Sequence, residues 1–339
     1  MQAPLPPQSS SQLSSSTQET QLFKDSSIFE RNDISDGYKS GALVYRLNQV
    51  IKENEAQGVT TGVSLVDLRT NRTLLNHNEN SVQFAASVNK VPIAWLVLQD
   101  LRAGKFKMTD TVSWTVSDVR GGYGVYDQAG APTTATVQDV IYDMLNHSGN
   151  TAVRVLVNYE LGGAVAVNNR LAIYPQLPNT RLQPLDGNRF YVGNSTAKES
   201  LWVMEQLLAK ADTYQTFMKK AMETNIFSYY GVRSQLEGND YIVLVNKVGI
   251  LDDVDGNNRH DTGIIYNTKT HRAYGYSFMT TTAYDNTTGT AQAEHSLDLM
   301  GRDVLRFAGD KPQKQVKANS DATLFKAQQG QTTESKVLY

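Results

Sequence analysis

The sequence predicts an α/β protein of the α+β type, in which one antiparallel sheet is flanked by helices and carries a helical insertion. Two observations support this fold class. Segments typical of strands lie towards both ends of the chain, and helical patterns fill its centre. Strands from both ends can meet in one sheet when helices cover its faces. The 339 residues, 40% of them hydrophobic, are enough to bury a substantial core.

The first folded elements are a helix and a hairpin. Apolar residues recur at helical spacing over 37–55, and the pattern ends near Gly58. Residues 59–68 then alternate as a strand does, and a turn at 70–72 leads to a second short strand at 73–77.

The central part, roughly 86–209, is predicted to be mainly helices and loops. A stretch with prolines at 175, 178 and 184 is expected to be a loop as far as Ser195, since proline breaks regular pairing. Helices are predicted on both sides of it, at 91–104, 136–145, 150–160 and 196–210.

Beyond residue 240 the pattern returns to strands. Three segments, 241–250, 260–267 and 272–283, read as strands, and an amphipathic helix follows over 291–307. The predicted organisation has a disordered linker and lead-in at 1–36, a folded domain at 37–309 and a polar tail at 310–339. Within the domain, 37–85 and 210–309 form the α/β part and 86–209 the helical part.

The N-terminal 25 residues are rich in Ser, Gln and Pro, a composition that cannot bury enough surface to fold. They have neither the basic start nor the apolar core of a signal peptide, and the longest apolar run, Val91–Leu98, is too short to span a membrane. We expect Met1 to begin a trimmed chain whose signal or anchor has been removed. We also expect the protein to act outside the cytoplasm, in the periplasm or at the cell surface, where it is either secreted or held by a membrane tether that lies outside this sequence.

Composition excludes several functions. A net charge of -2 gives no basic face for nucleic acid, and the absence of cysteine excludes disulfides, thiolate catalysis and zinc–thiolate sites. There is no G-x-S-x-G, H-E-x-x-H or phosphate-binding loop motif. His260-Asp261 is interpreted as a pair within a strand. No metal or cofactor is predicted.

Ser87-Val88-Asn89-Lys90 has the form S-x-x-K. On a helix, positions i and i+3 share a face, so the Lys90 amine can reach the Ser87 hydroxyl. Serine needs an adjacent base to become a nucleophile, and a lysine can serve where burial or nearby cations lower its pKa. The motif is weak alone, because Ser195-Thr196-Ala197-Lys198 also matches. There Thr196 and Glu199 predict a capping box at a helix start, so we interpret that match as structural.

Two further motifs follow Ser87 along the chain. Ser148 and Asn150 lie between two helical segments, and Lys247 lies near the end of an apolar strand. Ser148 could relay a proton, Asn150 could hold a substrate amide, and Lys247 could supply positive charge. The simpler alternatives are a helix N-cap for Ser148 and an exposed strand end for Lys247. The three motifs together favour the catalytic interpretation.

Here the chain resembles a known family. The order S-x-x-K, S-x-N, K-x-G is the signature of serine β-lactamases and penicillin-binding proteins, and the resemblance, over about residues 37–309, is to the class A branch. It implies a β-lactamase/transpeptidase-like fold, with a five-stranded antiparallel sheet and an inserted all-helical subdomain. The segments that resemble the family are GVSLVDLRTNRTLLNHNEN, FAASVNKVPIAWLVLQDLRAGK, GGYGVYDQAGAPTTATVQDVIYDMLNHSGNTAVRVLVNYELGG and HDTGIIYNTKTHRAYGYSFMT.

The resemblance also implies roles for individual residues. Tyr123 and Tyr126 lie in a loop that borders the substrate cleft in this family, although either tyrosine could simply pack there. The implied roles are Ser87 as nucleophile, Lys90 as base, Ser148 as proton shuttle, Asn150, Lys247, Gly249 and Tyr123 in substrate binding, and the backbone N–H groups of Ser87 and Ile250 as the oxyanion hole.

Three residues depart from the class A pattern. Gly149 stands where the second motif usually has Asp, and Val248 stands where the third usually has Thr or Ser. The missing hydroxyl would bind the substrate carboxylate, a hydrogen bond that contributes roughly 1.5–3 kcal/mol. Asp186 falls at the position of the deacylating Glu but is one methylene shorter. Asp186 could instead cap a turn with Gly187.

The sequence thus predicts a serine hydrolase that forms an acyl-enzyme at Ser87, with β-lactam hydrolysis as the first hypothesis. The alternatives are a penicillin-binding, DD-peptidase-like enzyme acting on cell-wall peptides, and a non-catalytic relative that only binds. The expected partner is a small-molecule β-lactam or a cell-wall peptide, and the oligomeric state is left open.

Overall fold

The computed structural model describes residues 36–309 apart from 186–187, 228, 237–239 and 254–255. The predicted tail and all but the last residue of the predicted lead-in lie outside the described residues. So does Asp186, the predicted deacylating residue. Within the described part of the chain, no helix has the length and apolar character needed to cross a membrane.

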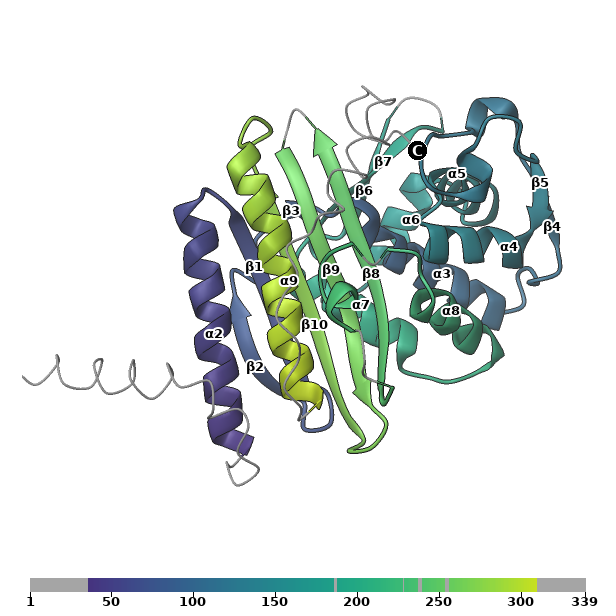
Figure 1. Cartoon of the computed structure of the whole chain (residues 1–339). Helices are drawn as coiled ribbons and strands as arrows, with labels where there is room; N and C mark the ends of the chain where they lie inside the picture. Colours follow the sequence, from purple (N-terminus) through teal and green to yellow (C-terminus); the bar gives the residue numbers. More distant parts are fainter. Residues whose placement is uncertain (1–35, 186–187, 228, 237–239, 254–255, 310–339) are drawn as a thin grey trace, which may run out of the picture.

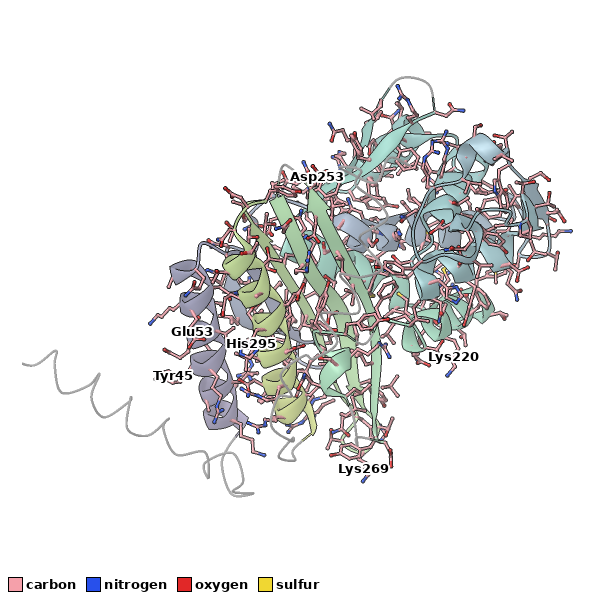
Figure 2. The ribbon with its side chains drawn as sticks, turned by 45° about the horizontal axis from the view of Figure 1, so that its top comes forward. Tyr45, Glu53, Lys220, Asp253, Lys269 and His295 are labelled. Atoms are coloured by element: carbon pink, nitrogen blue, oxygen red, sulfur yellow. The ribbon has the colours of Figure 1, made fainter. Side chains whose placement is uncertain are left out.

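A five-stranded antiparallel sheet joins the two ends of the domain, as predicted (Figure 1). Its order is β2-β1-β10-β9-β8, and β1 pairs with β10 from Thr60↔Thr281 to Asp67↔Tyr274. The strands are β1 (Thr60–Asp67), β2 (Arg72–His77), β8 (Ile242–Asp253), β9 (Gly256–Asn267) and β10 (Arg272–Thr282).

Helices cover both faces of this sheet. Alternate residues of a strand point to opposite faces, and β10 shows this clearly. Tyr276 and Phe278 join the core beneath α2 (Asp36–Ala56) and α9 (Thr287–Gly309), which pack on one another. The opposite face carries α7 (Ala197–Leu208), and a side chain at Gly275 would meet Leu201 of that helix.

The inserted helical region has its own core. Its central helix, α3 (Lys90–Arg102), is buried along nearly its whole length. Short helices surround it, and two of them end in π-helical turns, η5 (Asp143–His147) and η6 (Leu156–Glu160). The surrounding helices are α4 (Val137–Tyr142), α5 (Asn150–Val155), α6 (Ala164–Leu171) and α8 (Thr213–Glu223).

The proline-containing stretch contains strands, so the prediction of a loop as far as Ser195 was wrong there. β6 (Arg181–Pro184) and β7 (Phe190–Ser195) form a small sheet with β3 (Gln83–Phe84). Pro184 is tolerated because it ends an edge strand, where a missing N–H leaves no ladder partner. A second small sheet pairs β4 (Thr111–Ser113) with β5 (Thr134–Thr136).

Candidate active site

Ser87 lies on a short 3₁₀ turn, η2 (Ala86–Asn89), that leads directly into α3. The preceding residue, Ala86, has φ of 46°, a left-handed conformation that is unfavourable for a residue with a side chain. The Asn89 amide holds the turn in place by donating to the carbonyls of Val192 (2.6 Å) and Asn194 (3.0 Å) of β7. Ser87 is half-buried, and its hydroxyl makes no hydrogen bond to another described residue.

The same turn packs against strand β8 at Gly249. A Cβ at Gly249 would lie 3.0 Å from the Ala85 carbonyl oxygen and 3.2 Å from the Val88 nitrogen, so a side chain here would push the two backbones apart by a few tenths of an ångström. Ile250 follows Gly249 on β8. The N–H groups predicted to form the oxyanion hole, those of Ser87 and Ile250, therefore belong to two segments in direct contact; their role stays a prediction.

Ser148 lies between two buried lysines. The Lys90 Nζ donates to the Ser148 Oγ at 3.0 Å and to its carbonyl at 2.5 Å, and the Lys247 Nζ lies 2.9 Å from the same Oγ. Lys90 also donates to the Asn150 Oδ1 at 2.9 Å. The structure thus brings together four residues predicted from three separate motifs.

Burial makes both amines easier to deprotonate. Desolvation lowers the pKa of Lys90 from 10.5 to about 7, and the negative charges of Asp127 and Asp143 only partly oppose this effect. The pKa of Lys247 falls well below 10.5, because the side chain is buried and the charge of Lys90 is near. A lysine whose pKa is near neutrality can act as a general base.

Both simpler interpretations of these residues were wrong. Ser148 is not an N-cap: Gly149 takes that position for α5 and no side chain caps it. Instead Ser148 has left-handed φ and ψ of 59° and 36° and ends the η5 turn. Lys247 lies in the middle of β8 and is 1% exposed, because that strand continues to Asp253 rather than ending near Ile250.

Aromatic side chains lie beside this group. Phe227, Tyr229, Tyr230, Val248 and Ile250 line a small pocket. The rings of Phe227 and Tyr123 pack edge-on, with 5.5 Å between their centroids. The Lys247 Nζ lies 5.4 Å from the centroid of the Phe227 ring. Tyr123 is therefore placed beside the site, at its exposed edge.

The structure decides between the two alternatives for Tyr126 and adds three residues that were not identified from the sequence. Tyr126 is buried edge-on against Trp114 and serves packing. Phe227 was missed, although the aromatic run ahead of β8 was a usable signal. Asp127 and Asp143 were also missed, because no spacing rule connects them to Ser148.

His260 and Asp261 lie side by side on β9, as interpreted from the sequence. The His260 Nε2 is 2.8 Å from the Phe84 carbonyl and its Nδ1 accepts from the Thr280 N–H, and burial lowers its pKa to about 4. Asp261 accepts from Asn246, Tyr276 and the Val232 N–H. Among the described residues, no group of three His, Cys, Asp or Glu side chains forms a metal-binding cluster.

Comparison with known proteins agrees with this architecture. Residues 42–307 match the model of the β-lactamase enzyme family, Beta-lactamase2. The β-lactamase of Sphaerobacter thermophilus is 21% identical, with a TM-score of 0.66 over 79% of this chain and 98% of that one. The class A β-lactamase of Mycobacterium abscessus is 18% identical (TM-score 0.64; 78% and 98% covered), and PBP-A is 16% identical (0.64; 77% and 94%). No curated protein matches the sequence. At these identities, the structural likeness establishes the fold.

Proposed function

The chain belongs to the β-lactamase enzyme family, and from that premise we propose that it is a serine hydrolase that forms an acyl-enzyme at Ser87 with β-lactams. The observation that supports this proposal is the Ser148 hydroxyl within hydrogen-bonding distance of both Lys90 and Lys247. Two buried amines joined through a hydroxyl form a path along which a proton can move. A structural serine has no need of two desolvated lysines.

Acylation begins when neutral Lys90 takes the proton of Ser87. The Ser87 oxygen then attacks the carbonyl carbon of the β-lactam, and a C–O bond forms while the charge moves to the carbonyl oxygen. The N–H groups of Ser87 and Ile250 are proposed to stabilise that oxyanion. As the ring C–N bond breaks, the proton passes from Lys90 through Ser148 to the leaving nitrogen.

The Lys90 amine must turn towards Ser87 for the first step. In the structure it bonds Asn150 and Ser148 instead. Catalytic hydrogen bonds often form only when substrate is bound, so this geometry is compatible with the proposal. Asn150 would then release Lys90 and bind the substrate amide.

A second candidate is a penicillin-binding, DD-peptidase-like enzyme that is acylated and releases the product slowly. The observation that favours it concerns Asp127 and Asp143, the two carboxyl groups whose charges raise the pKa of Lys90. Asp127 and Asp143 each accept hydrogen bonds from backbone N–H groups of loop and helix segments around Ser148. Both oxygens of Asp127 and one oxygen of Asp143 are thus engaged in holding the backbone, and the deacylating role stays proposed for Asp186, which is one methylene shorter than the Glu of the class A pattern.

The experiment that tests both candidates mixes the protein with a chromogenic cephalosporin and follows both hydrolysis and intact mass. The Ser87→Ala variant is the control. Turnover that is lost in this variant supports β-lactam hydrolysis. A persistent adduct on Ser87 without turnover supports the penicillin-binding candidate. If neither turnover nor an adduct is seen, both candidates are contradicted and a non-catalytic binding role remains.

We also propose that the protein acts outside the cytoplasm, because cell-wall peptides and the antibiotics that mimic them are met there. Fractionation of producing cells, followed by detection with an antibody, tests this location. Recovery of the protein only with cytoplasmic markers would contradict it.

A further inference from the structure

The space beside Gly149 is filled by the carboxyl group of Asp143. A Cβ at Gly149 would lie 2.0 Å from the Asp143 Oδ2 and 2.8 Å from its Cγ. The φ of Gly149 is −56°, a value that any residue adopts without strain. A side chain at position 149 would therefore have to displace the neighbouring carboxyl group, whereas the backbone would tolerate it.

Asp143 is held firmly in this place. Its Oδ1 accepts from the Val125 N–H at 2.7 Å and lies 3.1 Å from the His147 Nδ1. Its Oδ2 is buried and has no hydrogen-bond partner, although the side chain is only 2% exposed. A buried carboxyl oxygen without a hydrogen-bond donor raises the free energy of the folded state, so its position beside Ser148 needs a physical explanation.

A second carboxyl group, that of Asp127, completes the arrangement. A Cβ at Gly124 would lie 2.6 Å from the Asp143 Oδ2, 2.8 Å from the Asp127 Oδ2 and 2.5 Å from the Gly149 Cα. Asp127 also accepts from the N–H groups of Asn150 (3.0 Å) and Thr151 (2.8 Å). The two carboxyl groups therefore pack closely against the two glycines, next to the loop that carries Ser148.

We propose that Asp143 is a positioning residue: packed against Gly149, its carboxyl group fixes Ser148 between the two lysines and places negative charge behind Lys90. This inference rests on the proposed function, because it concerns the same proton path. The backbone supports it, since the Gly149 N–H donates to the Asp143 carbonyl at 2.9 Å and closes the left-handed turn at Ser148.

The charges facing Lys90 agree with this role. They include Asp143 from η5, Asp127 from η4 (Val125–Asp127) and Lys247 from β8. The two carboxylates raise the pKa of Lys90 against the effect of its burial. The pKa of Asp143 is itself raised, first by burial and then by the charge of Asp127.

The test is a double-mutant cycle on the full chain with Gly149→Ala, Asp143→Ala and the double variant. The rate of Ser87 labelling by a fluorophosphonate is measured by intact mass, well below each unfolding temperature. In this reaction the Ser87 oxygen forms a bond to phosphorus, fluoride leaves and the hydroxyl proton goes to the base. We expect Gly149→Ala to slow labelling about a hundredfold, since a 1 Å misplacement has that effect, and Asp143→Ala in the same protein to restore much of the loss.

Two control variants separate this effect from general damage. Gly41→Ala adds a Cβ with no atom within 4 Å, so it should change nothing. Asp100→Asn alters a buried acid that pairs with Arg170 away from the site, so it should lower the unfolding temperature and leave the labelling rate unchanged.

A fourth variant, Asp143→Asn, keeps the shape of the side chain and removes its charge. We expect the midpoint of the labelling rate against pH to move to lower pH, because a charge that favours protonated Lys90 is gone. Independent, multiplicative effects in the cycle or an unmoved midpoint would overturn the proposal. If the fluorophosphonate labels Ser87 but β-lactams do not acylate it, the proposed function is contradicted and the positioning role of Asp143 is not. If the protein reacts with neither reagent, the unfolding free energies of the same four proteins still measure the coupling between Asp143 and Gly149.

Discussion

The pattern Ser-x-x-Lys occurs twice in this chain, and the two copies have opposite surroundings. At the first, Lys90 is fully buried and the Ser87 hydroxyl makes no hydrogen bond to a described residue. At the second, Ser195 is fully buried, and its hydroxyl lies 2.9 Å from the Thr180 hydroxyl and 3.0 Å from that of Ser200. Lys198 is exposed at the surface.

This difference shows which physical features separate the proposed catalytic copy of the pattern from the structural one. The Ser195 hydroxyl is already used in hydrogen bonds, and the Lys198 side chain is exposed to solvent. Ser87 has a hydroxyl available for reaction, and desolvation lowers the pKa of Lys90 to about 7. The pattern sets only the spacing between hydroxyl and amine; burial and partners set their chemistry.

The largest difference between the copies should appear when each serine is replaced. Ser87→Ala should abolish covalent labelling by a β-lactam or a fluorophosphonate, because it removes the hydroxyl that we propose as the nucleophile. Ser195→Ala should label at the rate of the unchanged protein but lose about 1–3 kcal/mol of unfolding free energy, since buried hydroxyl partners are left unpaired. Intact mass and urea unfolding measure the two effects. Labelling that survives in Ser87→Ala would show that the nucleophile is elsewhere.

Replacing each lysine gives the next largest effect. Lys90→Met should slow acylation about 10²- to 10⁴-fold, the usual contribution of general base catalysis. Lys198→Met should leave the rate unchanged, because this side chain is exposed and forms no part of the site. Stopped-flow acylation measures both variants. Equal rates in the two would contradict the assignment of Lys90 as the base.

Much of the fold could be predicted from the sequence, because hydrophobic periodicity is a local signal. The hairpin at 59–77 and the helix at 196–210 were found within a few residues, and Thr196 does cap the latter by accepting from the Glu199 N–H. The predicted capping box was only half right: the Glu199 carboxylate turns away to Asn179 and Thr180. The hydrogen-bond partners of the Glu199 carboxylate are set by a tertiary contact, which a local sequence pattern cannot predict.

The site was predictable where motifs mark it and not where packing builds it. Ser87, Lys90, Ser148 and Lys247 stand in recognisable triplets. Asp143 does not, because its role depends on a π-helical turn that brings its carboxyl group back against Gly149, six residues later. The absence of a side chain at 149 was visible in the sequence, and the group that fills the space was not.

The pH dependence of acylation distinguishes a buried lysine from an exposed one. The protonated amine of Lys90 cannot accept a proton, so the rate should rise with pH and level off, with a midpoint near the pKa of about 7. At pH 6 we expect a rate about tenfold below the plateau, because about one amine in ten is then neutral. Rates of Ser87 acylation between pH 5 and 9 test this. A midpoint near 10 would show that Lys90 is as well solvated as a lysine in an unfolded chain.

The smallest expected effect lies in how stability changes with pH. The pKa of Lys90 is about 7 in the folded protein and about 10.4 in an unfolded chain, so between these values the unfolded state binds more protons. Unfolding free energy should therefore rise with pH, by at most about 1.4 kcal/mol per pH unit for one proton. Relative to Lys90→Met, the unchanged protein should gain stability from pH 7 to 9. Urea unfolding at several pH values measures this, and a flat difference against Lys90→Met would mean that burial does not disfavour the charged amine.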